Sequence, residues 1–148
     1  MPSPPASMPP IFDPRARDSY KTWVAIPIRF GDQDSMGHVN NAVISTYFEQ
    51  ARCTHVSPLI VSPHCPTLNI VLARIVIDYV KEIRFPGVID VGIRIARIGN
   101  RSCTIASAVF SDATCCAVSE ATIVFFDTAS RRSATPPDAV RALLRNLM

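Results

Sequence analysis

The chain has 148 residues, of which 48% are hydrophobic and 18% charged, and its 15 basic and 12 acidic side chains leave a net charge of +3. This length and apolar content predict one folded domain and exclude a chain that stays disordered. The apolar runs are far shorter than the roughly 18 residues that a membrane-spanning helix needs, so no membrane partner is expected. The basic excess lies in residues 129–148 and forms no stripe, which argues against a nucleic-acid partner.

Prolines are concentrated at the N-terminus, where six of the 13 fall within the first 14 residues. This distribution predicts that residues 1–19 form a mobile tail and that residues 20–148 form the folded domain. Such a segment cannot form the apolar helix of a secretory signal. The five cysteines fit neither CxxC pairs nor a disulfide framework. We therefore expect a cytoplasmic protein with reduced thiols.

The hydrophobic pattern changes along the chain in a way that indicates an α+β fold. Residues 22–30 alternate between apolar and polar, which predicts a strand, and Pro27 places that strand at a sheet edge. Residues 41–56 carry apolar side chains at helical spacing and precede Pro58, which predicts one helix of about four turns. The remaining expected elements are a loop at 57–66, a meander of four strands near 73–80, 89–96, 102–110 and 115–126, and a terminal helix from Asp138.

One long helix and a broad antiparallel sheet indicate that the sheet wraps around the helix. A long sheet leaves an exposed edge, and pairing with a second copy is a common way to cover it. The sequence therefore predicts a homodimer or a dimer of dimers, that is, a homotetramer, with its sites between subunits.

Polar side chains gather where the first strand ends and the long helix begins. The free N–H groups of a helix N-terminus stabilise negative charge on an oxygen atom. A carboxylate in the same place can act as a nucleophile or as a general base. This combination suits acyl transfer. The residues concerned are Asp32, Asp34, His38, Asn40 and Asn41.

Structural roles for the same residues remain open at this point. Asp32 and Asp34 could form Asx turns, Asn40 could cap the helix, and His38 could pack between loop and helix. The D-x-D-x-x-G spacing lacks the later oxygen ligands of a calcium loop. The three histidines lack the spacing of a zinc site. We expect no metal.

The stretch at 28–41, continued at 47–52, resembles the signature of the hotdog-fold acyl-CoA thioesterases of the 4-hydroxybenzoyl-CoA thioesterase type. Residues 38–41 of this chain read His-Val-Asn-Asn, and they are similar to one variant of that signature. The resemblance extends over residues 22–147 and implies a hotdog fold, in which an antiparallel sheet of five to six strands wraps a long central helix. Shorter pieces that resemble the family in order and spacing are residues 77–79, 83–85, 98–102 and 124–127.

The resemblance also implies roles for individual residues. Asp34 matches the catalytic carboxylate, which attacks the thioester or activates water against it. The backbone N–H of Asn41 matches the amide that polarises the thioester carbonyl, and His38 matches a histidine implicated in catalysis in fatty-acyl thioesterases. The residues expected to bind substrate are Asn40, Arg101 and Ser102, the last two through the phosphates of CoA.

The expected activity is hydrolysis of an acyl-CoA, with fatty-acyl as the expected class, to free acid and CoA. A thiol has a pKa of about 8.5 and leaves readily, so one carboxylate and oriented N–H donors suffice. Coenzyme A is then part of the substrate, and no cofactor is expected. The alternatives are a non-catalytic acyl-CoA-binding hotdog protein, an acyl-carrier-protein thioesterase, and a hydratase or dehydratase of the same fold.

Overall fold

The structure is a computed structural model that describes residues 11–61 and 65–148. The strands are β1 (Thr22–Pro27), β2 (Leu68–Tyr79), β3 (Val88–Ile98), β4 (Ser102–Ser111), β5 (Thr114–Asp127) and β6 (Arg132–Ser133). The helices are α1 (Asn41–His55), α2 (Ser57–Ile60) and α3 (Asp138–Arg145), with short 3₁₀ turns η1 (Arg17–Ser19) and η2 (Phe30–Asp32).

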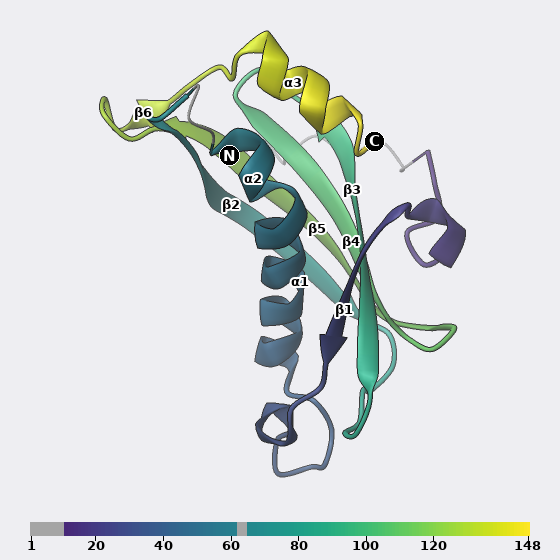
Figure 1. The fold of residues 1–148 in the computed structure, drawn as a ribbon. Coiled ribbons are helices and arrows are strands. Elements are labelled where there is room, and N and C mark those ends of the chain that lie inside the picture. The colour runs from purple at the N-terminus through teal and green to yellow at the C-terminus, as the bar shows by residue number, and fades with distance from the viewer. Residues whose placement is uncertain (1–10, 62–64) are drawn as a thin grey trace, which may run out of the picture.

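One antiparallel sheet in the strand order β1-β3-β4-β5-β2 forms the body of the molecule, and β6 pairs with the end of β5. The sheet curls around α1, which lies along its inner face (Figure 1). The expected hotdog-like arrangement of one helix in a sheet of five to six strands is confirmed, with a helix of 15 residues. The position of β1 at a sheet edge, predicted from Pro27, is also confirmed.

The predicted meander of four strands is wrong. β2 pairs with β5, so only β3, β4 and β5 are neighbours in both sequence and space. Between β2 and β3 the chain crosses under the start of α1, where the C=O of Ile83 accepts a hydrogen bond from the N–H of Val39 at 2.7 Å. Alternation along a strand identifies its buried face but not its partner, because pairing depends on distant segments.

The expected loop at 57–66 is also partly wrong, because Ser57–Ile60 form the short helix α2. Pro58 lies in the first turn of α2, where the N–H group that proline lacks would have no acceptor within the helix. Residues 62–64 of the expected loop lie outside the described residues.

The main core lies between α1 and the inner face of the sheet. Apolar side chains of the helix face a row of isoleucine and valine side chains from β3, and α3 closes one end of this layer through Val140 and Leu144. Burial of such side chains contributes about 1.5–3 kcal/mol each. The helix residues that are buried here are Ile44, Tyr47, Phe48 and Ala51, and the β3 residues are Ile89, Val91, Ile93 and Ile95.

The outer face of the sheet carries a smaller aromatic cluster that the N-terminal strap, residues 12–20, covers. Tyr20 packs edge-on against Trp23 and Phe110, with ring centroids 5.9 and 6.4 Å apart. The guanidinium of Arg17 lies 4.3 Å from the centre of the Trp23 ring and pairs with Asp90 at 2.6 Å. Residues 1–10 of the expected mobile tail (residues 1–19) lie outside the described residues, so their mobility stays a prediction, whereas residues 12–19 pack against the sheet as the strap.

The strand β2 leaves one edge without a partner strand among the described residues. Several of its apolar side chains are exposed, including Val71, Leu72 and Val76. Within residues 11–61 and 65–148, no helix is both long and apolar enough to span a membrane.

Candidate active site

The segment between β1 and α1 is held by a buried carboxylate. Asp32 is only 2% exposed, and its carboxylate accepts hydrogen bonds from the backbone N–H and the Nε of Arg29, each at 2.9 Å, and from the hydroxyl of Tyr47 at 2.7 Å. Burial alone raises the pKa of this carboxyl, but the hydrogen bonds from Arg29 and Tyr47 outweigh it and hold the pKa below its ordinary value. Asp32 is therefore a charged anchor at the base of the loop.

Backbone hydrogen bonds close the loop above this anchor. The C=O of Asp32 accepts the N–H of Asn40 at 2.9 Å, and Gln33 and Val39 form an antiparallel bridge. The N–H of Asp34 donates to the C=O of His38 at 3.0 Å. The two predicted catalytic side chains therefore project from a short, hydrogen-bonded turn.

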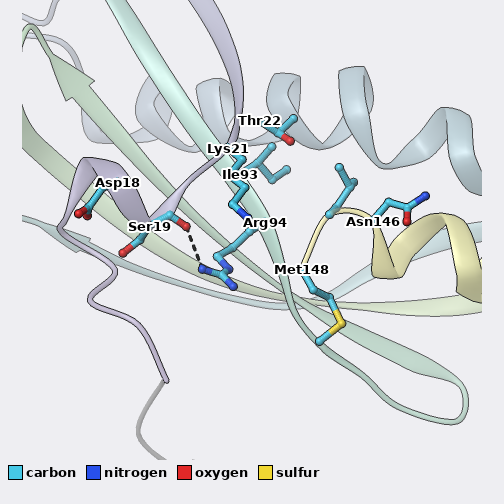
Figure 2. A pocket seen from close by; sticks show the side chains of 9 residues that line it. Asp18, Ser19, Lys21, Thr22, Ile93, Arg94, Asn146 and Met148 are labelled. Carbon is cyan, nitrogen blue, oxygen red and sulfur yellow. Dashed lines mark hydrogen bonds between the residues drawn. The ribbon is translucent and has the colours of Figure 1, made fainter.

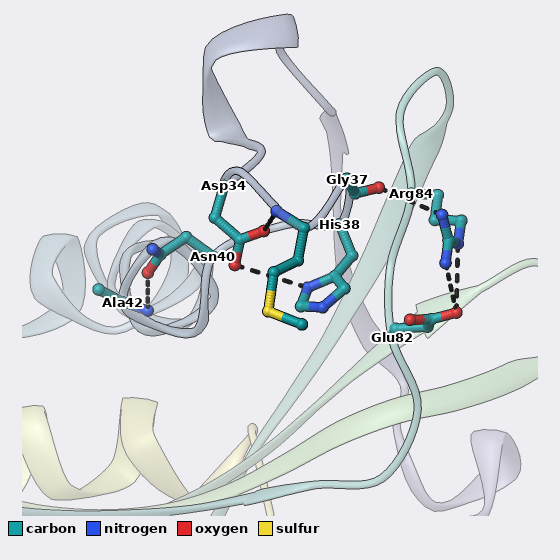
Figure 3. A network of polar contacts seen from close by, with 8 residues as sticks. Asp34, Gly37, His38, Asn40, Ala42, Glu82 and Arg84 are labelled. Atoms are coloured by element: carbon teal, nitrogen blue, oxygen red, sulfur yellow. Dashed lines mark hydrogen bonds and ion pairs between the residues drawn. The ribbon is translucent and has the colours of Figure 1, made fainter.

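Asp34 and His38 lie side by side at the surface of this turn (Figure 3). The Nδ1 atom of His38 is 3.7 Å from Oδ2 of Asp34, and each side chain is 26% exposed. The other oxygen of Asp34, Oδ1, accepts the N–H of Met36 at 2.8 Å. This arrangement holds a carboxylate and an imidazole within reach of each other while both stay open to a ligand.

The helix N-terminus begins directly after this pair. The side-chain oxygen of Asn40 accepts the N–H of Ala42 at 2.8 Å, so the interpretation of Asn40 as a helix cap is confirmed, and its predicted contact with substrate stays a prediction. Asn41 is the first residue of α1. Its N–H has no acceptor within the helix, as for every first-turn residue, and can donate to an oxyanion.

A cavity of about 190 Å³ opens between this helix end and the segment that follows β2. The hydroxyl of Tyr79, at the end of β2, donates to the C=O of Asn41 at 3.2 Å across it. The sequence pattern did not reveal the hydrogen bonds of the Tyr47 and Tyr79 hydroxyl groups, because helical spacing marked Tyr47 only as a core residue and alternation marked Tyr79 only as a strand residue. The cavity is lined by His38, Val39, Asn41, Ile44, Tyr79, Val80, Lys81 and Glu82.

Arg101 and Ser102 lie at the opposite end of the sheet from Asp34. The loop of Asp34 follows Pro27, which pairs with Val88 at the start of β3, whereas Arg101 lies in the turn after the last residue of β3 (Figure 1). A strand of 11 residues spans about 36 Å. One chain therefore does not bring these residues together, and their predicted phosphate contacts stay predictions.

A second cavity, of about 120 Å³, lies between η1 and the chain after α3 (Figure 2). The guanidinium of Arg94 points into this region, but it donates to the C=O of Ser19 at 2.9 Å and stacks over Phe12 at 4.2 Å. The polar group in this cavity is therefore used to hold the strap against the sheet. Among residues 11–61 and 65–148, no three His, Cys, Asp or Glu side chains gather as a metal site would require.

The candidate site thus combines a carboxylate and an imidazole in the loop that leads into a helix N-terminus, and the sheet curls around that helix (Figure 1). A family model described as "Thioesterase-like superfamily" matches residues 28–144. This chain belongs to the thioesterase-like superfamily. The superfamily match includes Asp34, His38 and Asn41, and begins after the N-terminal strap.

Solved structures support the same superfamily. The PA5185 protein of Pseudomonas aeruginosa shares 28% identity at a TM-score of 0.81, over 90% of this chain and 96% of that one. A predicted thioesterase from Bacillus stearothermophilus shares 28% identity at 0.78, over 85% and 95%. A Thermus thermophilus thioesterase, solved with coenzyme A and Zn, shares 30% identity at 0.73, over 84% and 92%. A search of curated protein sequences found no match.

Proposed function

We propose that this protein hydrolyses acyl-CoA thioesters to a free acid and CoA, with Asp34 as its catalytic carboxylate. The observation that carries the proposal is the position of Asp34, 3.7 Å from His38 in the loop that leads into the N-terminus of α1. Membership of the thioesterase-like superfamily supports it. The similar Thermus thermophilus thioesterase binds coenzyme A, which supports the same class of substrate here.

The residues present supply each step of a thioester hydrolysis. The N–H of Asn41 donates to the carbonyl oxygen of the substrate and stabilises the negative charge that develops there. Asp34 either takes a proton from a water molecule, whose oxygen attacks the carbonyl carbon, or attacks that carbon itself to give an anhydride that water then opens. In both routes the carbon–sulfur bond breaks and CoA leaves as a thiolate that takes up a proton.

His38 fits this mechanism as the partner of Asp34. An imidazole 3.7 Å from a carboxylate can orient it and can hold or return the proton that Asp34 accepts. The cavity next to this pair is lined in part by Val39 and Ile44, but these side chains are 1% and 3% exposed and offer little apolar surface to an acyl group in the single chain. The proposed fatty-acyl class therefore rests on the family resemblance of residues 28–41.

A homodimer completes the proposed site. Antiparallel pairing of the free β2 edges would bury Val71, Leu72 and Val76, which are exposed in the single chain. A two-fold axis between the paired strands places the sheet end that carries Arg101 in one copy beside the sheet end that carries Asp34 in the other. The phosphates of CoA bound at one Asp34 would then lie toward Arg101 and Ser102 of the second copy.

The cysteines support the proposed location in the cytoplasm. All five, at positions 53, 65, 103, 115 and 116, are free thiols. Free thiols persist in a reducing compartment.

Thiol release from a panel of acyl-CoAs and acyl-carrier proteins, with short, long and aromatic acyl groups, tests the proposed function. We expect turnover of acyl-CoA by the wild type. Binding of acyl-CoA without turnover would instead favour the non-catalytic binding protein. Turnover confined to acyl-carrier proteins would favour the carrier-protein thioesterase.

A further inference from the structure

The hydrogen bond between Asp32 and Tyr47 joins the loop that carries Asp34 to the body of the long helix. Tyr47 lies in the second turn of α1 and is buried, and its hydroxyl donates to Oδ2 of Asp32 at 2.7 Å. Asp32 stands two residues before Asp34, and Tyr47 stands six residues after Asn41. One contact therefore connects the strand side of the loop with the helix that supplies the proposed N–H donor.

The side chain of Asp34 has no comparable anchor of its own. Its contacts are with the N–H of Met36 and with His38, and both partners belong to the same loop. These contacts shape the turn but do not fix it against the helix. Because Asp32 also accepts the N–H of Asn40 through its C=O, its position determines where the loop leaves and where it rejoins α1.

Because Asp32 is buried, its position depends on the particular groups that donate hydrogen bonds to it. A buried carboxylate is costly unless donors surround it, and here Arg29 and Tyr47 provide three hydrogen bonds of 2.7–2.9 Å. Loss of the Tyr47 hydroxyl leaves Oδ2 of Asp32 with only the N–H of Arg29. The carboxylate is then expected to turn toward Arg29 and solvent, and the loop is expected to shift with it.

We infer that Asp32 and Tyr47 are positioning residues, which hold the carboxylate of Asp34 and the N–H of Asn41 at the separation that thioester hydrolysis requires. This inference rests on the proposed function. A misplacement of about 1 Å between reacting groups can lower a rate by about 100-fold. The anchor therefore acts on the rate of the chemical step rather than on substrate affinity.

Tyr47→Phe tests this inference with the smallest possible change, since it removes one hydroxyl and keeps the ring in the core. We expect kcat for acyl-CoA hydrolysis to fall by roughly 10-fold to 100-fold while KM stays within about 2-fold. Tyr20→Phe is the matched control, because the Tyr20 hydroxyl is also part of a single hydrogen bond, to the C=O of Pro14 at 2.8 Å, on the opposite face of the sheet. The control should retain the wild-type kcat.

Asp32→Asn should lower kcat to a similar level, because it replaces one of the two acceptor oxygens used by Arg29 and Tyr47 with an NH₂ group, which can only donate. The double variant Asp32→Asn/Tyr47→Phe should be little worse than either single variant, since both changes break one unit. Additive losses would contradict the inference. So would a Tyr47→Phe variant that retains kcat, or one whose KM alone rises.

Amide hydrogen exchange supplies a measurement that does not depend on activity. The N–H groups of Met36 and Asn40, bonded to Asp34 and Asp32, should exchange at least about 10-fold faster in Tyr47→Phe than in wild type or in Tyr20→Phe. Unchanged exchange would overturn the inference even if activity fell. If the wild type turned over no thioester, the proposed function and with it the catalytic part of the inference would be wrong, and faster exchange would establish only the anchor.

Discussion

Tyr20 packs directly over Gly92 on the outer face of the sheet. A Cβ atom at position 92 would lie 2.7 Å from Cγ and 2.8 Å from Cβ of Tyr20, and 3.0 Å from the Trp23 ring. Both Tyr20 atoms are close to the backbone and cannot swing away without moving the strap. Gly92 therefore provides the space in which the N-terminal strap is seated.

Gly92→Ala should lower the free energy of unfolding by about 1–3 kcal/mol, because the added methyl group overpacks this contact. Gly31→Ala is the control, since no atom lies within 4 Å of its added Cβ, and its effect should stay within about 0.5 kcal/mol. Urea unfolding followed by tryptophan fluorescence measures both, because Trp23 belongs to the cluster under the strap. Equal stability of the two variants would show that the strap is not seated as described.

Acid should weaken the anchor of the loop that carries Asp34, the proposed catalytic residue. The pKa of Asp32 lies below its ordinary value of 3.8, because hydrogen bonds from Arg29 and Tyr47 outweigh the effect of burial. A carboxyl with a lowered folded-state pKa adds stability above the unfolded-state pKa, and this stability is lost as the pH falls through the folded-state pKa. Asp32→Asn should therefore be less stable than wild type at about pH 7 but should lose less stability between about pH 5 and pH 3.

Urea unfolding of both proteins across this pH range measures the difference. If the stabilities of wild type and Asp32→Asn fall in parallel as the pH is lowered, the charge of Asp32 does not stabilise the folded protein.

A charge on the free edge of the sheet should disrupt the proposed dimer. Val76 lies near the middle of β2 and is 40% exposed in the single chain. Val76→Lys would place an ammonium group within the proposed pairing of two β2 strands, where charged side chains oppose edge association. In analytical ultracentrifugation, we expect the wild type to have twice the mass of one chain. We expect Val76→Lys to shift toward the mass of one chain and to lose thioesterase activity.

Val88→Lys is the matched control for this experiment, because Val88 is also exposed but lies on β3, away from the β2 edge. It should sediment as the wild type does. A wild-type monomer with full activity would show that one chain suffices for the site.

The sequence alone indicated the strand with Pro27, the helix from Asn41 and the polar loop between them, because each depends on local patterns of alternation, spacing and capping. The partner of β2 could not be found in this way, since it is selected by packing across the whole sheet. Tyr47 looked like any other apolar-face residue of the helix. Its contact with Asp32 joins residues 15 positions apart, and only the fold brings them together.

The distance between Asp34 and Arg101 illustrates the same limit in the candidate site. The resemblance placed both in one substrate site, whereas the fold puts them at opposite ends of the sheet. The proposed dimer through the β2 edges would bring the two residues of different copies closer together, in line with the sites between subunits that the sequence predicted. The sequence predicted an oligomer but not the strand edge that would form it, because the free edge of β2 follows from the pairing of β2 with β5.

Thiol release by wild type and by Asp34→Ala, with one acyl-CoA that the wild type turns over, tests the central claim most directly. We predict that the substitution lowers kcat/KM by at least about 100-fold, as expected for loss of a catalytic carboxylate. The control Asp18→Ala, in η1, should remain as active as wild type. An Asp34→Ala variant with wild-type activity would contradict the assignment of Asp34 as the catalytic residue.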